Sequence, residues 1–172
     1  MHTHARCRRP VSLRTRGAVA SALLVLAAGC SSGGGDVEVD GPSLGADDAA
    51  ACDRLVAALP DTLAEQDRRT VTPADAPGAA WGDPAITLTC GVDVPKGFDE
   101  FSSCEVANGV GWYVDPATID DQSADVTLTA VGYRPIVRVE VPADYRPSGP
   151  AAVIAELAGP VRRSLELVKP CH

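Results

Sequence analysis

The chain has 172 residues, of which 15 are Lys or Arg and 23 are Asp or Glu, so its formal net charge is −8. An acidic surface repels nucleic acid, and this excludes the nucleic-acid-binding classes that rely on basic patches. The length suits one globular domain with short additional segments.

Residues 1–29 are typical of an export signal. Five arginines precede the first acidic residue, Asp36, and an apolar run follows from Gly17 to Ala28. That run is too short to span a bilayer, which takes roughly 20 residues. The sequence Leu26-Ala27-Ala28-Gly29-Cys30 resembles the bacterial lipobox, and this resemblance implies cleavage before Cys30 and lipidation of its thiol. An ordinary secretory signal with a chance cysteine is the alternative.

Removal of residues 1–29 leaves 10 basic and 23 acidic residues, a formal charge of −13. Such a chain repels anionic headgroups, so the acyl chains on Cys30 would have to hold it at the extracytoplasmic face of the cell membrane. Residues 30–46 are rich in Gly, Ser and Asp, and they are expected to form the lipidated cysteine and a flexible tether. Residues 47–172 are expected to form a single domain.

The predicted domain begins with a helix over residues 49–59, capped by Asp47 or Asp48. Pro60 weakens its continuation. Alternating apolar and polar residues then predict half-buried strands over residues 86–90 and 137–141, with another β-rich run over 126–133. Within residues 106–114, Asn108-Gly109 is a common two-residue hairpin turn.

The last predicted element is a helical segment that opens at Ser148-Gly149-Pro150 and keeps its apolar residues on one face. Gly159-Pro160 is expected to kink or split it. The order of helix, antiparallel strands and helix predicts an α+β fold, in which a small antiparallel sheet carries the N-terminal and C-terminal helices on one face.

The mature chain keeps four cysteines besides Cys30, and an even number outside the cytosol favours two disulfides. Four cysteines allow three pairings. We expect Cys90 to pair with Cys104 across a short excursion, and Cys52 to pair with Cys171 between the first and last helices. A four-thiolate metal site is the alternative, but the chain has no C-x-x-C pair.

The mature chain also resembles an actinobacterial family of lipoproteins labelled domain of unknown function 3515. The resemblance implies a location at the cell envelope and no particular activity, since no catalytic or binding residues are assigned to that family. It runs over most of the domain through Ala51-Cys52 with Leu55, Ala58-Leu59-Pro60, Arg68-Arg69, Ala80-Trp81-Gly82-Asp83-Pro84, Leu88-Thr89-Cys90-Gly91-Val92, Asn108-Gly109-Val110-Gly111-Trp112, and residues 135–142.

Few catalytic chemistries fit the mature chain. His172 is its only histidine, which argues against Ser-His-Asp and Cys-His catalysis and against His-rich metal sites, and no nucleotide-binding motif occurs. We therefore expect no cofactor, no metal and no enzymatic activity. The alternative is a small carboxylate-dependent envelope hydrolase, which needs only two acidic residues. Its candidates are Asp83, Asp115, Asp120, Asp121 and Asp125.

The stretch Asp115–Asp125 also has the oxygen ligands of a calcium site, although it lacks the EF-hand order, and a surface loop is the favoured interpretation. Cations are scarce in the mature chain, and arginine suits carboxylate or phosphate recognition. The candidate ligand-binding residues are Arg68, Arg69, Trp81, Trp112, Tyr133 and Arg134. The simpler interpretation pairs the arginines with nearby acids and buries the aromatics.

Taken together, these observations favour a non-enzymatic module, anchored to the membrane through the lipid on Cys30, that binds an envelope protein or a cell-wall component. A structural spacer is a third hypothesis.

Overall fold

We examined a computed structural model, which describes residues 35–171. All of them belong to one compact unit. The predicted signal peptide and Cys30 lie outside the described residues. Within residues 35–171, no helix is long and apolar enough to cross a membrane.

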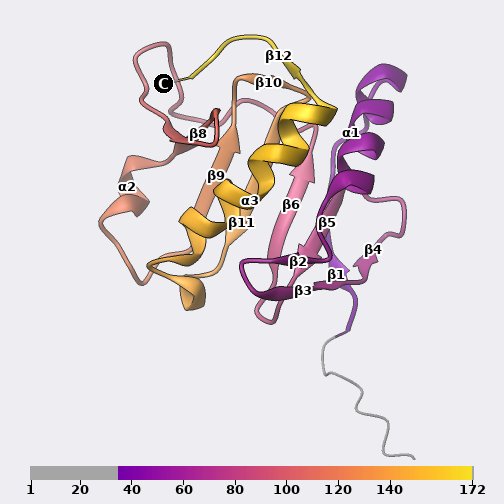
Figure 1. The fold of residues 1–172 in the computed structure, drawn as a ribbon, viewed down its shortest axis with the longest axis horizontal. Helices are drawn as coiled ribbons and strands as arrows, with labels where there is room; N and C mark the ends of the chain where they lie inside the picture. Colours follow the sequence, from indigo (N-terminus) through magenta and orange to yellow (C-terminus); the bar gives the residue numbers. More distant parts are fainter. Residues whose placement is uncertain (1–34, 172) are drawn as a thin grey trace, which may run out of the picture. The chain divides into compact units, whose positions relative to one another are not determined.

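The fold is a mostly antiparallel sheet with helices packed on it (Figure 1). The main sheet has eight strands in the order β2-β3-β5-β6-β11-β9-β8-β7. These are β2 (Thr62–Leu63), β3 (Gln66–Arg69), β5 (Gly78–Trp81), β6 (Ile86–Cys90), β11 (Val137–Val141), β9 (Val126–Ala130), β8 (Val110–Val114) and β7 (Glu105–Ala107).

Four short strands form two further pairs. Strands β1 (Val37–Glu38) and β4 (Val71–Thr72) are parallel, whereas β10 (Tyr133–Arg134) and β12 (Glu166–Leu167) are antiparallel. The helices are α1 (Ala46–Ala58), α2 (Pro116–Ile119) and α3 (Gly149–Ser164), with a 3₁₀ turn at Ala143–Tyr145. The predicted α+β class with two disulfides is confirmed. The sheet, however, is larger than expected, and α2 was not predicted.

One face of the sheet forms the core with α1 and α3. The alternating residues Val137, Val139 and Val141 of β11 are completely buried, as the period of two predicts. Their neighbours in register, Leu88 and Leu128, belong to the same apolar cluster as the buried sides of α1 and α3. Packing of two helices against one apolar face explains why both are amphipathic.

The hairpin prediction is confirmed. Ala107 and Val110 pair across a two-residue turn in which Asn108 and Gly109 both have positive φ, at 47° and 82°. This is the backbone that Asn-Gly favours, because it matches the twist of the flanking strands. The turn is also tied to α3, since Asn108 Nδ2 donates to the carbonyl oxygen of Ala155 at 2.9 Å.

Two helix predictions are corrected. Gly45 precedes α1 as its N-cap residue without a side-chain cap, so Asp47 and Asp48 lie within the first turn, where they favour the helix dipole. Helix α3 continues through Gly159-Pro160 and is not split. Pro160 is buried, and Val161 beyond it packs in the core like Leu157 before it, so packing on both sides holds the helix together.

The predicted disulfide pairing is wrong. Cys52 bonds Cys90, and Cys104 bonds Cys171. Cys90 ends β6 on the core side of the sheet, opposite Val137 in register, where α1 presents Cys52 to it. The connection after β6 leads away from that strand and places Cys104 beside Cys171, near the C-terminus. Sequence spacing alone did not distinguish a short excursion from this arrangement.

The segment expected to be a tether is packed in its described part. We call residues 35–44 the N-terminal strap. Val39 is 3% exposed, and its N–H donates to the carbonyl oxygen of Thr72 at 3.0 Å. Arg69 Nη2 donates to the carbonyl oxygen of Gly35 at 2.8 Å. The domain therefore begins earlier than residue 47, because a short Val-x-Val alternation within the Gly-rich segment pairs with β4.

Candidate functional site

The six candidate ligand-binding residues fall in separate places. Trp81 is buried under Arg68, whose guanidinium carbon lies 5.3 Å from the ring centroid, and its Nε1 donates to the carbonyl oxygen of Pro60 at 3.0 Å. Burial lowers the pKa of Arg68, partly offset by Asp61. Arg69 donates to the carbonyl oxygen of Gly82 at 2.7 Å as well as to the strap. These contacts connect β3 and β5 to the backbone at Gly35, Pro60 and Gly82.

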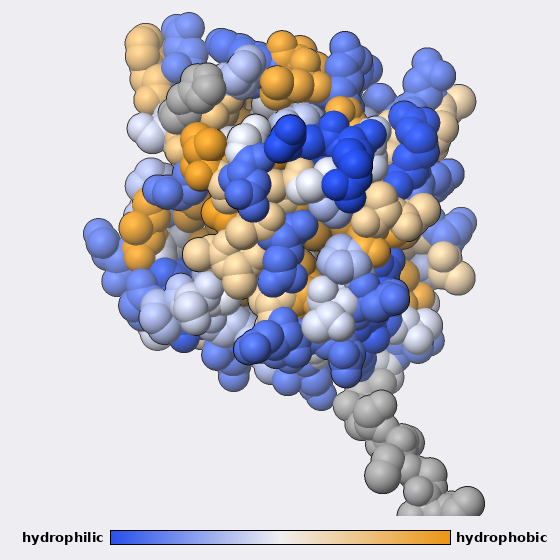
Figure 2. Space-filling model, viewed as in Figure 1, coloured by the Kyte–Doolittle hydropathy of each residue, from blue (hydrophilic) through white to orange (hydrophobic). Residues whose placement is uncertain are grey.

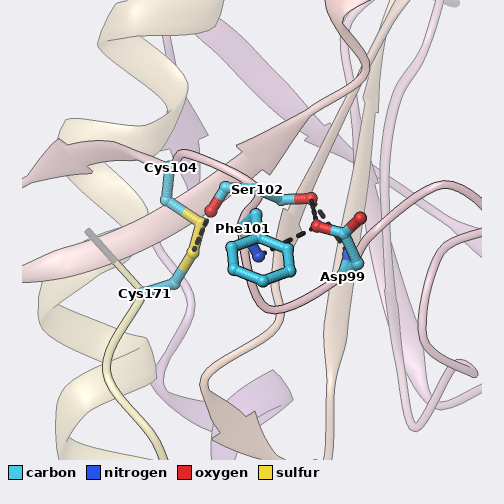
Figure 3. Close-up of a disulfide and its surroundings, with 5 residues drawn as sticks. All are labelled: Asp99, Phe101, Ser102, Cys104 and Cys171. Atoms are coloured by element: carbon cyan, nitrogen blue, oxygen red, sulfur yellow. Dashed lines mark hydrogen bonds between the residues drawn. A yellow bond between two sulfur atoms is a disulfide. The ribbon is translucent and has the colours of Figure 1, made fainter.

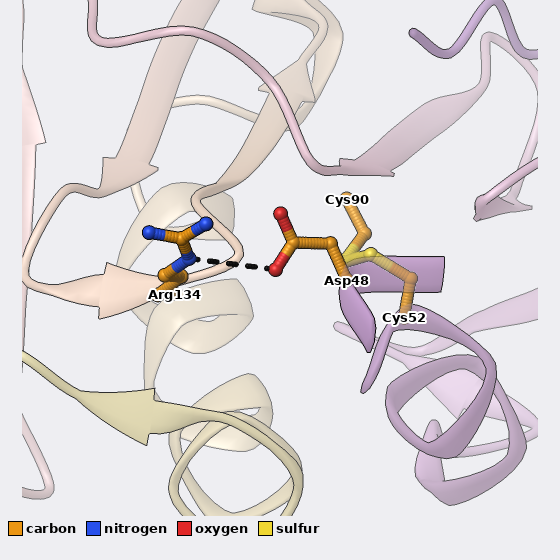
Figure 4. Close-up of polar contacts among 4 residues, drawn as sticks. All are labelled: Asp48, Cys52, Cys90 and Arg134. Carbon is orange, nitrogen blue, oxygen red and sulfur yellow. Dashed lines mark hydrogen bonds and ion pairs between the residues drawn. A yellow bond between two sulfur atoms is a disulfide. The ribbon is translucent and has the colours of Figure 1, made fainter. Parts of the chain in front are cut away.

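The other three candidates lie elsewhere. Trp112 is completely buried in the core, and its Nε1 has no hydrogen-bond partner among the described residues. Tyr133 is 5% exposed, and burial raises the pKa of its hydroxyl. Arg134 is largely exposed, and its Nε lies 3.5 Å from Asp48 Oδ1, near the Cys52–Cys90 disulfide (Figure 4). A ligand-binding role for these six residues stays a prediction.

Three of the acidic residues offered for a hydrolase or a calcium site, Asp115, Asp121 and Asp125, accept hydrogen bonds within loops. Asp115 accepts the N–H of Ala117 at 2.9 Å and caps α2, and Asp125 accepts the N–H of Ala143 at 2.9 Å. Asp121 accepts the hydroxyl of Ser123, and this bond lowers the pKa of the carboxyl. A general acid for glycoside cleavage needs a raised pKa instead.

Arg146 hydrogen-bonds to the backbone of the same loop. Arg146 donates to the carbonyl oxygens of Thr118 and Ile119 at 3.1 and 3.2 Å and to that of Ala124 at 3.4 Å. Backbone oxygens that a cation would otherwise use therefore face a guanidinium of the chain itself. Across residues 35–171, no group of three or more His, Cys, Asp or Glu is placed to hold a metal ion.

The most prominent surface feature surrounds the end of the chain. After α3, the tail pairs through β12 with β10, and Val168 and Lys169 donate to the carbonyl oxygen of Gly132 at 2.9 and 3.2 Å. A Cβ on Gly132 would lie 2.4 Å from the carbonyl oxygen of Lys169, and one on Gly111 would lie 2.1 Å from that of Cys171. Gly111 therefore permits the tail to cross β8, which accounts for the second glycine of Asn108-Gly109-Val110-Gly111.

Three cavities are lined by residues of this tail, and a fourth adjoins the first of them. Their volumes are about 450, 380, 90 and 520 Å³. The first shares Val131 with the second and Cys171 with the third, while Ser102 joins it to the fourth. Tyr133 joins the second and third cavities. The predicted pair Tyr133 and Arg134 thus forms one part of a larger hollowed surface.

Exposed apolar side chains gather on that surface. Among the described residues six large hydrophobic side chains are exposed, and five of them line these cavities. These are Phe101 (85% exposed), Val168, Val106, Leu167 and Ile119. Figure 2 shows hydrophobic residues exposed over β12 and around the end of the chain, among hydrophilic neighbours. We call the four cavities and these five side chains the disulfide surface.

The comparisons with known proteins give a family. A family described as "Protein of unknown function (DUF3515)" matches residues 17–170. The chain belongs to this family. Comparison with curated proteins and with solved structures gives no significant match. In this member of DUF3515, several residues of the family motifs have structural roles. Trp81 and Arg69 hydrogen-bond to the backbone of neighbouring segments, and Gly111 leaves room for the tail.

The loop that carries Phe101 is held in place (Figure 3). Asp99 Oδ1 accepts the N–H of Phe101 at 2.9 Å and the hydroxyl of Ser102 at 3.0 Å, and Ser102 Oγ accepts the N–H of Asp99 at 2.9 Å. The Cys104–Cys171 disulfide ties the same loop to the tail. Sequence reasoning missed this surface, because Phe101 stands in a polar loop that has no periodic hydrophobic pattern. The Asp99-x-x-Ser102 spacing was the available clue.

Proposed function

We propose that this protein is a lipid-anchored, non-enzymatic module of the cell envelope that binds another protein through the disulfide surface. The carrying observation is that five exposed large apolar side chains line three of the four adjoining cavities. Exposed apolar groups in a contiguous patch are costly in water, and they commonly mark interaction sites. Interface residues that are fixed before binding lose less conformational entropy when they dock.

The anchor is supported by the lipobox-like sequence that ends at Cys30. The packed strap leaves only residues 31–34 between Cys30 and Gly35, and five Cα steps span at most about 18 Å. An anchored domain would therefore stay close to the bilayer, with the side that carries β1 and β4 toward it. In Figure 1 that side lies away from α2 and the end of the chain, so the disulfide surface would remain accessible.

The anchor is tested by Cys30→Ser. The variant is expected either to leave the membrane fraction or to remain there uncleaved, and mass spectrometry of its N-terminus separates the two. A processed serine variant that stays in the membrane would contradict lipid anchoring.

The binding surface is tested by placing a photo-crosslinking amino acid at Ile119 or Leu167 of the full chain in intact cells. Asp53 on α1, an exposed site outside the disulfide surface, is the matched control. Both surface positions are expected to crosslink to the same envelope protein, and position 53 is not. The proposal fails if neither surface position gives a specific product, or if the control gives the same one.

A further inference from the structure

The fourth cavity, which we call the Phe101 cavity, has a distinct chemical character. Its volume is about 520 Å³, and its apolar lining includes Phe101, Ile119 and Tyr113. Among the described residues, the charged ones that line it are Glu105 and Asp115, and no lysine or arginine does. An apolar hollow with negative charge at its rim is complementary to an apolar group next to a positive one.

Both walls of the Phe101 cavity are fixed by contacts within the chain. The Asp99 turn and the Cys104–Cys171 disulfide hold the wall that contains Phe101. On the other wall, Arg146 donates to the carbonyl oxygen of Ile119 at 3.2 Å. The cavity therefore exists without a ligand, and binding does not have to order it.

We propose that the Phe101 cavity binds a protein segment in which an apolar side chain stands next to a lysine or arginine. The apolar side chain packs between Phe101 and Ile119, and the basic group pairs with Glu105 or Asp115. This inference rests on the proposed function and adds the chemistry of the partner. Phe101 is the anchor residue, because aromatic side chains dominate the energetics of protein interfaces.

The position of the cavity argues against a membrane as the occupant. The strap contacts the sheet beside β5, where Val39 lies against Gly78, whereas the cavity borders β8 and β7 at the other edge. Four strand steps separate β5 from β8, a distance of about 19 Å. Acidic groups at the rim also repel anionic headgroups.

The test uses the full chain in detergent micelles and a displayed library of random peptides as the probe. Enriched peptides are then synthesised, and their affinities are measured by fluorescence polarisation. We expect enrichment of peptides with an apolar residue next to Lys or Arg. Phe101→Ser is expected to weaken binding at least about 10-fold. The double change Glu105→Gln and Asp115→Asn is expected to weaken it about 3-fold and to reduce its salt dependence.

Val94→Ser is the matched control, since Val94 is 56% exposed and does not line the Phe101 cavity. It is expected to leave the affinity unchanged, and urea unfolding shows that every variant is folded. Failure to enrich peptides, enrichment of acidic ones, or insensitivity to Phe101→Ser would overturn the inference. So would saturable binding to vesicles of anionic lipid or self-association through the cavity. If crosslinks still form at Ile119 and Leu167, the proposed function survives that failure.

Discussion

The two disulfides are expected to differ in what their removal costs, and loop length alone predicts the opposite order. Cys104 and Cys171 are 67 residues apart and Cys52 and Cys90 are 38 apart, so the loop-entropy model gives about 4.4 and about 3.9 kcal/mol. Cys52 and Cys90, however, are completely buried. Replacing both with alanine also opens core space, which adds about 1–2 kcal/mol. The buried pair should therefore cost more.

The assay is urea denaturation of the two Cys→Ala double variants, followed by the fluorescence of the buried Trp81 and Trp112. Removal of Cys104–Cys171 is expected to lower the unfolding free energy by about 4 kcal/mol, or the melting temperature by about 15 °C. Removal of Cys52–Cys90 is expected to lower the free energy by about 5–6 kcal/mol. A loss under 1 kcal/mol for either pair, or a clear reversal of the order, would show that loop closure and core burial do not set these costs.

Three further predictions follow from single contacts. Gly111→Ala places a Cβ about 2 Å from a tail carbonyl oxygen, so it should destabilise the protein by about 1–3 kcal/mol and speed amide exchange in the tail; unchanged tail exchange would count against it. Arg69→Ala removes the bond to Gly35 and should make the strap the first site of proteolysis, whereas cleavage elsewhere would contradict this. The pKa of Asp121 is lowered in the folded state, so its contribution to stability is present above the unfolded pKa and is lost as pH falls through the folded pKa. Ser123→Ala should raise the folded pKa of Asp121 in an NMR titration. An unchanged pKa would show that the Ser123 hydrogen bonds are not the cause.

Much of the fold was predictable, because hydrophobic period and turn chemistry act locally. The alternation in Val137–Val141 and the Asn108-Gly109 turn each gave the correct element. The disulfide pairing depends on which residues meet in three dimensions, and the spacing of Cys90 and Cys104 misled the prediction. Strap residues such as Val39 were missed, since two valines among glycines and acids give too short a pattern.

The site was less predictable than the fold. Arginine and tryptophan attract attention in a cation-poor, aromatic-poor chain, yet Trp81 and Arg69 make their contacts with the backbone of their own fold. Phe101 is exposed because of the turn at Asp99 and of the disulfide that joins Cys104 to Cys171, at the other end of the domain. Neither relation appears as a motif in the sequence.

Carboxyl footprinting in native membranes shows whether a partner covers the disulfide surface. The labelling of Glu100 and Glu105, which line the disulfide surface, is compared between the chain in isolated envelopes and the purified full chain, with Asp53 as the internal reference. If the disulfide surface is bound in the envelope, Glu100 and Glu105 are labelled several-fold more slowly there, and Asp53 is labelled equally in both. Equal labelling of all three carboxyls, or protection of Asp53 alone, would contradict binding at that surface.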